Sequence, residues 1–233
     1  MNYVILNGIK STTINGLLIQ SLPSISKPLM RTQTEEIDGK DGDIVTPLGY
    51  ASYDKEVTIG LYGDFNIDDV VAYFNGSGTV IFSNEHDKFY YYTIVKQIDY
   101  ERLIRFRTAK VTFHVQPFKY SSVEKPLYVS TDDITEITVT NTGNTTAKPA
   151  IIIYGSGNIT LSLNGQEILQ IALGDDEYIT IDSAQMEAFK GDILKNRLVI
   201  GDYENLVLKA GRNTISWSGD VFQIVISNYS RWI

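Results

Sequence analysis

The sequence of 233 residues has no cysteine and only two histidines. Without cysteine there are no disulfides, no thiolate zinc sites and no cysteine nucleophiles. No apolar run approaches the roughly 20 residues that a membrane helix requires. Residues 1–8 lack a basic segment and become polar too early for a signal peptide, so we expect a protein that is made and kept soluble.

Basic residues are also scarce. The chain has 20 Lys and Arg against 28 Asp and Glu, which gives a formal net charge of −8 and a pI near 4.8. A stable complex with nucleic acid requires a basic surface that neutralises phosphates, so specific nucleic-acid binding is disfavoured. An acidic surface is still compatible with DNA that passes nearby without being bound.

Catalytic signatures are equally sparse. The only imidazoles are His86, in a charged turn at residues 83–88, and His114, in an alternating strand where a structural role is expected. No Gly-x-Ser-x-Gly elbow is present, and nothing points to a pair of glycosidase carboxylates among the acidic residues. We therefore predict that the protein is not an enzyme and has no cofactor.

Two glycine-containing patterns resemble ligand sites. The Gly-Ser-Gly triplets at residues 76–78 and 155–157 lead into strands and lack the rest of a phosphate loop, so a turn is sufficient for each. The acidic loop at residues 35–43 offers oxygen ligands for calcium, but its spacing does not match an EF-hand. We predict a solvated loop and no metal site.

The positive signal is alternation of apolar and polar residues. It runs through residues 57–61, 111–115, 159–163, 213–217 and 221–226, and this period of two predicts strands with one face in a core. Asn164-Gly165 predicts a hairpin turn, and Ser218-Gly219-Asp220 predicts another. The fold class is therefore all-β.

One segment has helical spacing. Ile67, Val70, Val71 and Phe74 lie at i, i+3, i+4 and i+7, with Asn66 as an N-cap, which predicts one short helix. Residues 183–189 offer a second, weaker helical pattern. Polar residues and a proline near residues 120–129 interrupt the strands and predict two domains, residues 1–126 and 127–233.

The order of these motifs resembles the distal tail proteins of siphophages, a hub family located between the tail tube and the adsorption apparatus. The resemblance rests on an ordered set of segments along nearly the whole chain: the glycine-rich loop at 38–44, Leu48-Gly49-Tyr50, the helix ending at 74–78, the aromatic strand at 90–95, Pro117-Phe118-Lys119-Tyr120, residues 139–144 and 148–157, residues 181–183, 201–211 and 213–217, and the C-terminal Arg231-Trp232-Ile233.

That resemblance implies a first domain with a split-barrel-like fold and one helix, which builds a hexameric ring. It implies a second domain that is a galectin-like β-sandwich. The homo-hexamer is expected to join the tail tube protein to the tail-tip protein (a tail-associated lysin or spike) and to receptor-binding proteins, and to leave a channel for DNA without binding it. The expected location is the virion tail tip, after assembly in the bacterial host cytoplasm, with no membrane contact.

Two sets of site residues follow. An extended hairpin at residues 34–53 is expected to form the subunit interface by β-augmentation, through Asp38, Gly39, Asp41, Gly42, Asp43 and Tyr50. The alternative function is recognition of host cell-wall sugars by the C-terminal sandwich, through the aromatic residues Tyr154, Tyr178 and Tyr203. Trp217 lies in an alternating strand and is expected in the core.

Overall fold

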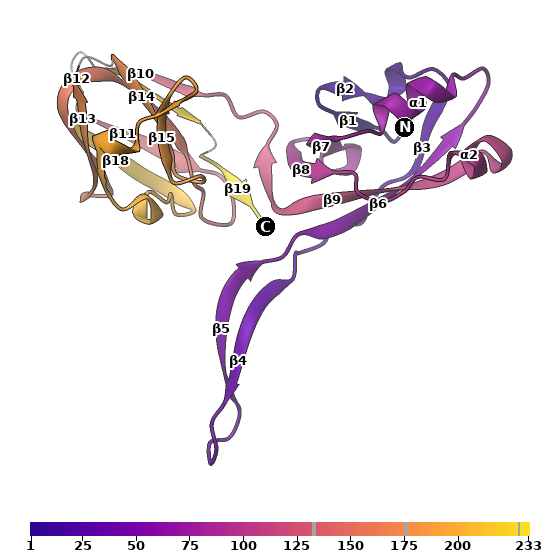
Figure 1. Ribbon diagram of the computed structural model, residues 1–233, viewed down its shortest axis with the longest axis horizontal. Helices are drawn as coiled ribbons and strands as arrows, with labels where there is room; N and C mark the ends of the chain where they lie inside the picture. The colour runs from indigo at the N-terminus through magenta and orange to yellow at the C-terminus, as the bar shows by residue number, and fades with distance from the viewer. Residues whose placement is uncertain (132–133, 175–176, 228) are drawn as a thin grey trace. The chain divides into compact units, whose positions relative to one another are not determined.

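The computed structural model describes residues 1–131, 134–174, 177–227 and 229–233, and strands dominate it (Figure 1). The chain divides into two compact units, residues 1–122 with Ile233 and residues 123–232. The boundary expected from the sequence, between residues 126 and 127, lies a few residues further along the chain. The predicted all-β class is confirmed.

The first unit is an antiparallel sheet that curls around one core, with strand order β2-β1-β7-β8-β9-β6-β3. Its strands are β1 Val4–Leu6, β2 Ile9–Lys10, β3 Leu17–Ser21, β6 Tyr53–Leu61, β7 Ser77–Phe82, β8 Lys88–Thr93 and β9 Thr108–Ser121. Between β3 and β6 the chain forms a hairpin of its own, β4 Met30–Glu36 and β5 Asp43–Tyr50.

Alternation places every second side chain of these strands in the core. Along β8, Tyr90 and Tyr92 are buried, whereas Phe89 and Tyr91 lie on the opposite face. Half of this aromatic run therefore belongs to the core. In the core of this unit aromatic rings pack edge to face, and the ring centroids of Phe82 and Phe113 are 5.7 Å apart.

The predicted helix is α1, Ile67–Tyr73. The Asn66 side chain accepts a hydrogen bond from the Asp68 amide at 3.0 Å, as an N-cap should. Val70 and Tyr73 form the buried face of this helix, and Gly76 follows it with φ +81°. The apolar spacing and the cap thus both act as the sequence predicted.

A second helix, α2 Tyr100–Phe106, was not predicted from the sequence. The Asp99 side chain caps it by accepting from the Arg102 amide at 2.8 Å, and Leu103 alone is fully buried. Arg107 ends it in the left-handed region, at φ +57°. A helix of two turns that buries one side chain leaves too short an apolar pattern to detect.

The second unit contains the remaining strands. They are β10 Leu127–Ser130, β11 Glu136–Asn141, β12 Ala150–Leu163, β13 Gln166–Gly174, β14 Tyr178–Asp182, β15 Glu187–Lys190, β16 Ile193–Leu194, β17 Val199–Gly201, β18 Gly211–Ser227 and β19 Arg231–Trp232. The Asn164-Gly165 turn joins β12 to β13 with φ +52° and +81°, so that hairpin prediction is confirmed. Residues 183–189 form no helix, because a turn and β15 occupy them.

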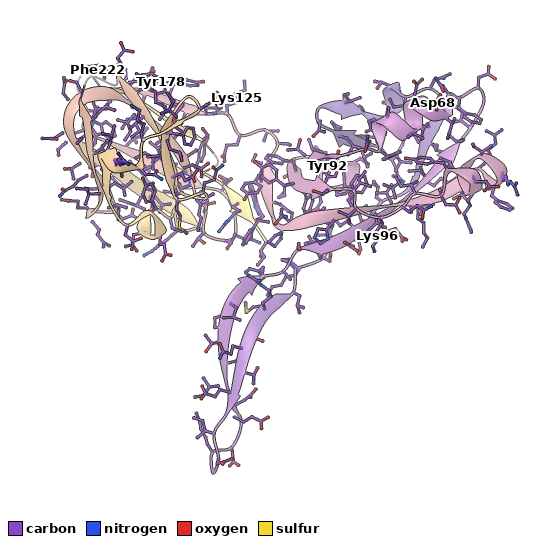
Figure 2. The ribbon with its side chains drawn as sticks, in the orientation of Figure 1. Asp68, Tyr92, Lys96, Lys125, Tyr178 and Phe222 are labelled. Atoms are coloured by element: carbon purple, nitrogen blue, oxygen red, sulfur yellow. The ribbon has the colours of Figure 1, made fainter. Side chains whose placement is uncertain are left out.

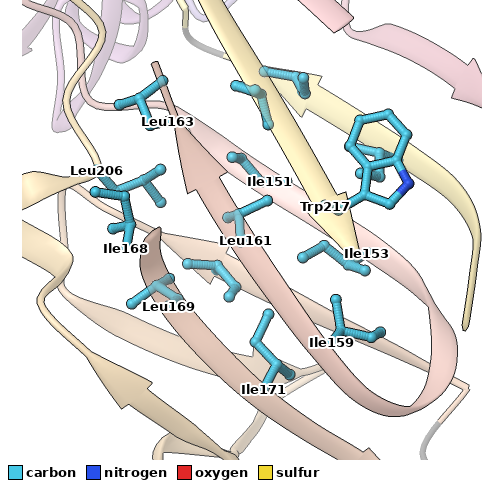
Figure 3. Packing of buried hydrophobic residues seen from close by; sticks show 14 of the residues in the cluster. Ile151, Ile153, Ile159, Leu161, Leu163, Ile168, Leu169, Ile171, Leu206 and Trp217 are labelled. Atoms are coloured by element: carbon cyan, nitrogen blue, oxygen red, sulfur yellow. The ribbon is translucent and has the colours of Figure 1, made fainter. Parts of the chain in front are cut away.

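Two long strands, β12 and β18, each bend and thereby fold one sheet into two layers. Their first and second halves pair with different neighbours, β14 and β10 in one layer and β13 and β11 in the other. Ile151, Leu161, Trp217 and their neighbours fill the space between the layers (Figure 3). Trp217 is 6% exposed and lies in this core, as expected.

The bend in β18 corrects one prediction. Ser218-Gly219-Asp220 is not a hairpin turn between two strands but the corner of a single strand of 17 residues. Gly219 has φ +98°, and a Cβ there would lie 2.3 Å from the Asn158 carbonyl oxygen. The two backbones approach too closely at this corner for any other residue.

Candidate assembly interface

The hairpin formed by β4 and β5 is the most exposed part of the structure. Its pairing runs from Met30↔Tyr50 to Glu36↔Asp43, and Gly39 and Gly42 lie in the loop with φ +81° and +78°. Every residue from 29 to 49 is exposed, so neither face of this ribbon covers a core. Figure 2 shows its side chains standing free along the arm.

Large apolar side chains occupy this ribbon nonetheless. They are Leu29, Met30, Ile37, Ile44, Val45 and Leu48, exposed by between 39% and 73%. A two-stranded hairpin is marginally stable in water unless a third strand or another surface covers it. Its outer strand edges also carry unpaired backbone groups that suit β-augmentation. The arm therefore has the composition and geometry of a segment that docks on a partner.

The tip of the arm is acidic. Residues 29–50 contain five carboxylates, Glu35, Glu36, Asp38, Asp41 and Asp43, against Arg31 and Lys40. Within the described ranges no three metal-ligating side chains converge, here or elsewhere. The loop surrounds an open hollow of about 560 Å³ that is lined by residues 36–40, 42 and 43. Its carboxylates face solvent in the isolated subunit.

Of the six residues predicted for the interface, five lie together in or beside this loop and one does not. Tyr50 lies at the opposite end of the hairpin, where its ring packs edge to face on Phe118 with centroids 5.8 Å apart. The Ala51 amide donates to the Leu29 carbonyl at 2.8 Å and closes the hairpin there. Tyr50 therefore belongs to the root of the arm.

The root depends on residues that the prediction missed. The segment between β3 and β4, residues 22–29, has no regular structure, so its carbonyls other than that of Leu29 lack ladder partners. Side chains of the first unit donate to three of these carbonyls instead. Asn84 Nδ2 donates to the Pro23 carbonyl at 2.9 Å, and Lys55 Nζ donates to the Ser24 carbonyl at 3.0 Å. Tyr53 Oη donates to the Ser26 carbonyl at 3.5 Å.

The sequence did contain a signal for one of these donors. When the alternation of residues 57–61 is extended two positions back, Lys55 falls on the core-facing side of β6. The structure places it there, 2% exposed. Lys119 occupies the equivalent inward position on β9 and is also buried.

The aromatic residues considered for sugar binding divide into two groups. Tyr154 and Tyr178 are direct neighbours on β12 and β14, with ring centroids 5.4 Å apart and 33° between planes. The Lys190 ammonium lies 5.2 Å from the Tyr178 ring centroid, over one face of this pair. Tyr203 packs against the sandwich core instead, and burial raises the pKa of its phenol.

Comparison with known proteins identifies the fold. No protein-family profile and no curated protein sequence matches the chain. Among solved structures, the crystal structure of SPP1 Dit (gp 19.1), described as a paradigm of the hub adsorption apparatus in phages that infect Gram-positive bacteria, matches with a TM-score of 0.69. That match has 17% identity and covers 100% of both chains.

Two further solved structures are similar. A chain of the phage P2 baseplate in its activated conformation with Ca matches with a TM-score of 0.54 at 12% identity, over 97% of this chain and 98% of that one. The activated baseplate with Sr gives a TM-score of 0.52 at 12% identity, with 96% and 97% covered. The resemblance to siphophage distal tail proteins inferred from the sequence is thus confirmed at the level of the fold, and the chain has the fold of the SPP1 Dit hub protein along its whole length.

Proposed function

We propose that the chain is a structural subunit of a long, non-contractile phage tail, in which six copies form a ring hub at the distal end. The observation that carries this proposal is the match to SPP1 Dit, which covers 100% of both chains and so includes both units. The ring joins the tail tube to the tail-tip protein and to receptor-binding proteins. It has no catalytic role.

The exposed arm supports a ring. A closed ring requires an interface between two different surfaces of each subunit, repeated by rotation. The β4–β5 arm offers unpaired strand edges and uncovered apolar side chains, which a neighbouring copy would bury. With a net charge of −8, a central channel in such a ring would let DNA pass without holding it.

The test is the mass of the purified chain by light scattering, followed by negative-stain imaging of the same peak. We expect six copies and a central channel. Deletion of residues 38–43 at the arm tip is expected to abolish the ring while leaving both units folded. A wild-type chain that stays monomeric at high concentration contradicts the ring, and an intact ring in the deletion variant contradicts the role of the tip.

A second function is favoured by the Tyr154–Tyr178 pair, which would offer an aromatic surface to a cell-wall sugar. A glycan array and a cell-wall pull-down test it. Binding that is lost in Tyr154→Ala but kept in Tyr203→Ala would support this site, whereas an absence of binding by the wild type would exclude it.

A further inference from the structure

Three charged side chains are buried together beside the root of the arm. Glu85 joins two of its neighbours, accepting from Lys119 Nζ at 2.9 Å and from Tyr90 Oη at 2.6 Å. Lys55 is the third charge, and among the described residues no carboxylate lies within 4.0 Å of its ammonium. The cluster therefore contains one cation more than its ion pair needs.

Aromatic rings surround this additional cation. The Lys55 ammonium lies 5.0 Å from the ring centroid of Tyr90, 5.5 Å from that of Tyr53 and 5.8 Å from that of Phe82. Its hydrogen-bond acceptor is the Ser24 carbonyl, 3.0 Å away. Burial lowers the pKa of Lys55, and the nearby Glu85 charge opposes that effect.

Burying an ammonium group in a core costs free energy, because the charge loses its hydration. Its desolvation is compensated only when the geometry around it is good, and an apolar side chain of similar length often serves stability as well or better. The methionine side chain, however, cannot donate to a carbonyl. What Lys55 adds to the packing is thus a directional bond to the irregular segment that leads into the arm.

We infer that Lys55 is a positioning residue for the arm: its buried ammonium, held beside the Glu85–Lys119 pair, fixes Ser24 and thereby the direction in which β4 and β5 leave the main sheet of the first unit. Asn84 and Tyr53 act on the carbonyls on either side of it. The importance of this direction for assembly rests on the proposed ring, because an arm that swings freely loses entropy when it docks. The fixing of the root itself does not depend on the ring.

The test is Lys55→Met, with two measurements on the full chain. Hydrogen exchange of the Ala51 amide, which closes the root, is expected to become about tenfold faster or more, since a bond to a charged donor is lost. Light scattering is expected to show loss of the six-copy species at concentrations where the wild type assembles. The midpoint of urea unfolding should remain unchanged or rise. Lys10→Met, which removes an exposed cation from the half-buried Tyr3 ring, is the matched control and should change none of these.

Unchanged exchange at Ala51 in a folded Lys55→Met variant overturns the inference. If that variant does not fold, the double variant Asn84→Ala, Tyr53→Phe removes the two flanking bonds and leaves the charges in place. Faster exchange at Ala51 is then expected, and wild-type exchange overturns the inference. A wild-type chain that forms no ring contradicts the proposed function alone, since the exchange measurement still decides the role of Lys55.

Discussion

The ammonium of Lys119 lies 2.9 Å from a carboxylate oxygen of Glu85, and both side chains are only 8% exposed. Burial on its own raises the pKa of Glu85, but the hydrogen bonds from Tyr90 and Lys119 outweigh it, so the pKa falls below its usual range. The buried carboxylate is therefore charged and fully engaged. Tyr90 and Lys119 each donate to a different oxygen of this carboxylate.

Removal of one partner should be costly. Lys119→Met leaves the Glu85 charge without its ion pair, and we expect a loss of about 3–5 kcal/mol in the free energy of unfolding, measured with urea. The control is Lys110→Met, whose ammonium pairs with Glu56 on an exposed surface and should cost less than about 1 kcal/mol. Equal losses in the two variants would contradict this account of the buried pair.

The pH dependence of the second unit should depend on Glu124. Burial raises the pKa of this carboxyl above its usual range, although the Tyr229 amide, which donates to it at 2.9 Å, acts in the opposite direction. A raised pKa in the folded state contributes stability that is present below the unfolded pKa of 4.5 and is lost as the pH rises through the folded value.

Glu124→Gln should accordingly melt at a higher temperature than the wild type at pH 7, and the difference should disappear at pH 4. Thermal unfolding followed by tryptophan fluorescence measures this. Glu136→Gln, an exposed carboxylate in the same unit, serves as control and should alter the melting temperature little at either pH. A Glu124→Gln variant that is less stable at pH 7 would contradict the sign.

The arm should be a site of proteolysis in the free subunit. Lys40 lies in the exposed loop at its tip, where a protease can bind the backbone, so brief trypsin treatment is expected to give fragments 1–40 and 41–233. In the assembled ring the same bond should be protected at least about tenfold, because a neighbour covers the arm. Lys40→Gln removes this cut and identifies it. Equal rates for monomer and ring would show that the tip stays uncovered.

The corner of β18 should tolerate no side chain. Gly219→Ala combines a left-handed backbone with a Cβ that meets the Asn158 carbonyl, and we expect a loss of about 2 kcal/mol or more. Gly157 lies at the neighbouring bend with φ +69° and open space around it, so Gly157→Ala should lose only about 1 kcal/mol. Urea unfolding of the two variants distinguishes a close backbone approach from backbone conformation alone.

The features predicted well are those that a short window of sequence determines. The cap and spacing of α1 and the Asn164-Gly165 turn all act within a few residues. The corner at Gly219 was mistaken for a turn because both need a positive φ, and only the pairing of β18 with β12 tells them apart. That pairing joins residues far apart in the chain, which a local pattern does not specify.

Of the candidate site, the sequence predicted the acidic loop but not the residues at the root of the arm. The acidic loop is a local feature, and the sequence located it at the hairpin tip. Lys55 was missed because a lysine in a strand usually marks a solvated face, and its partners, Ser24 and Glu85, come from two other segments. Only its inward place in the alternation of β6 distinguished it.

Pro47 protects the subunit from aggregation before it assembles. A ribbon with open edges is a template on which like chains can stack into fibres. Pro47 interrupts the row of amide donors along β5, and stacking identical arms would bring the carboxylates at 35, 36 and 43 against their own copies. Pro47 and these carboxylates thus disfavour arm-to-arm stacking of newly made subunits. The arm remains available for the different surface of a neighbouring copy that it complements.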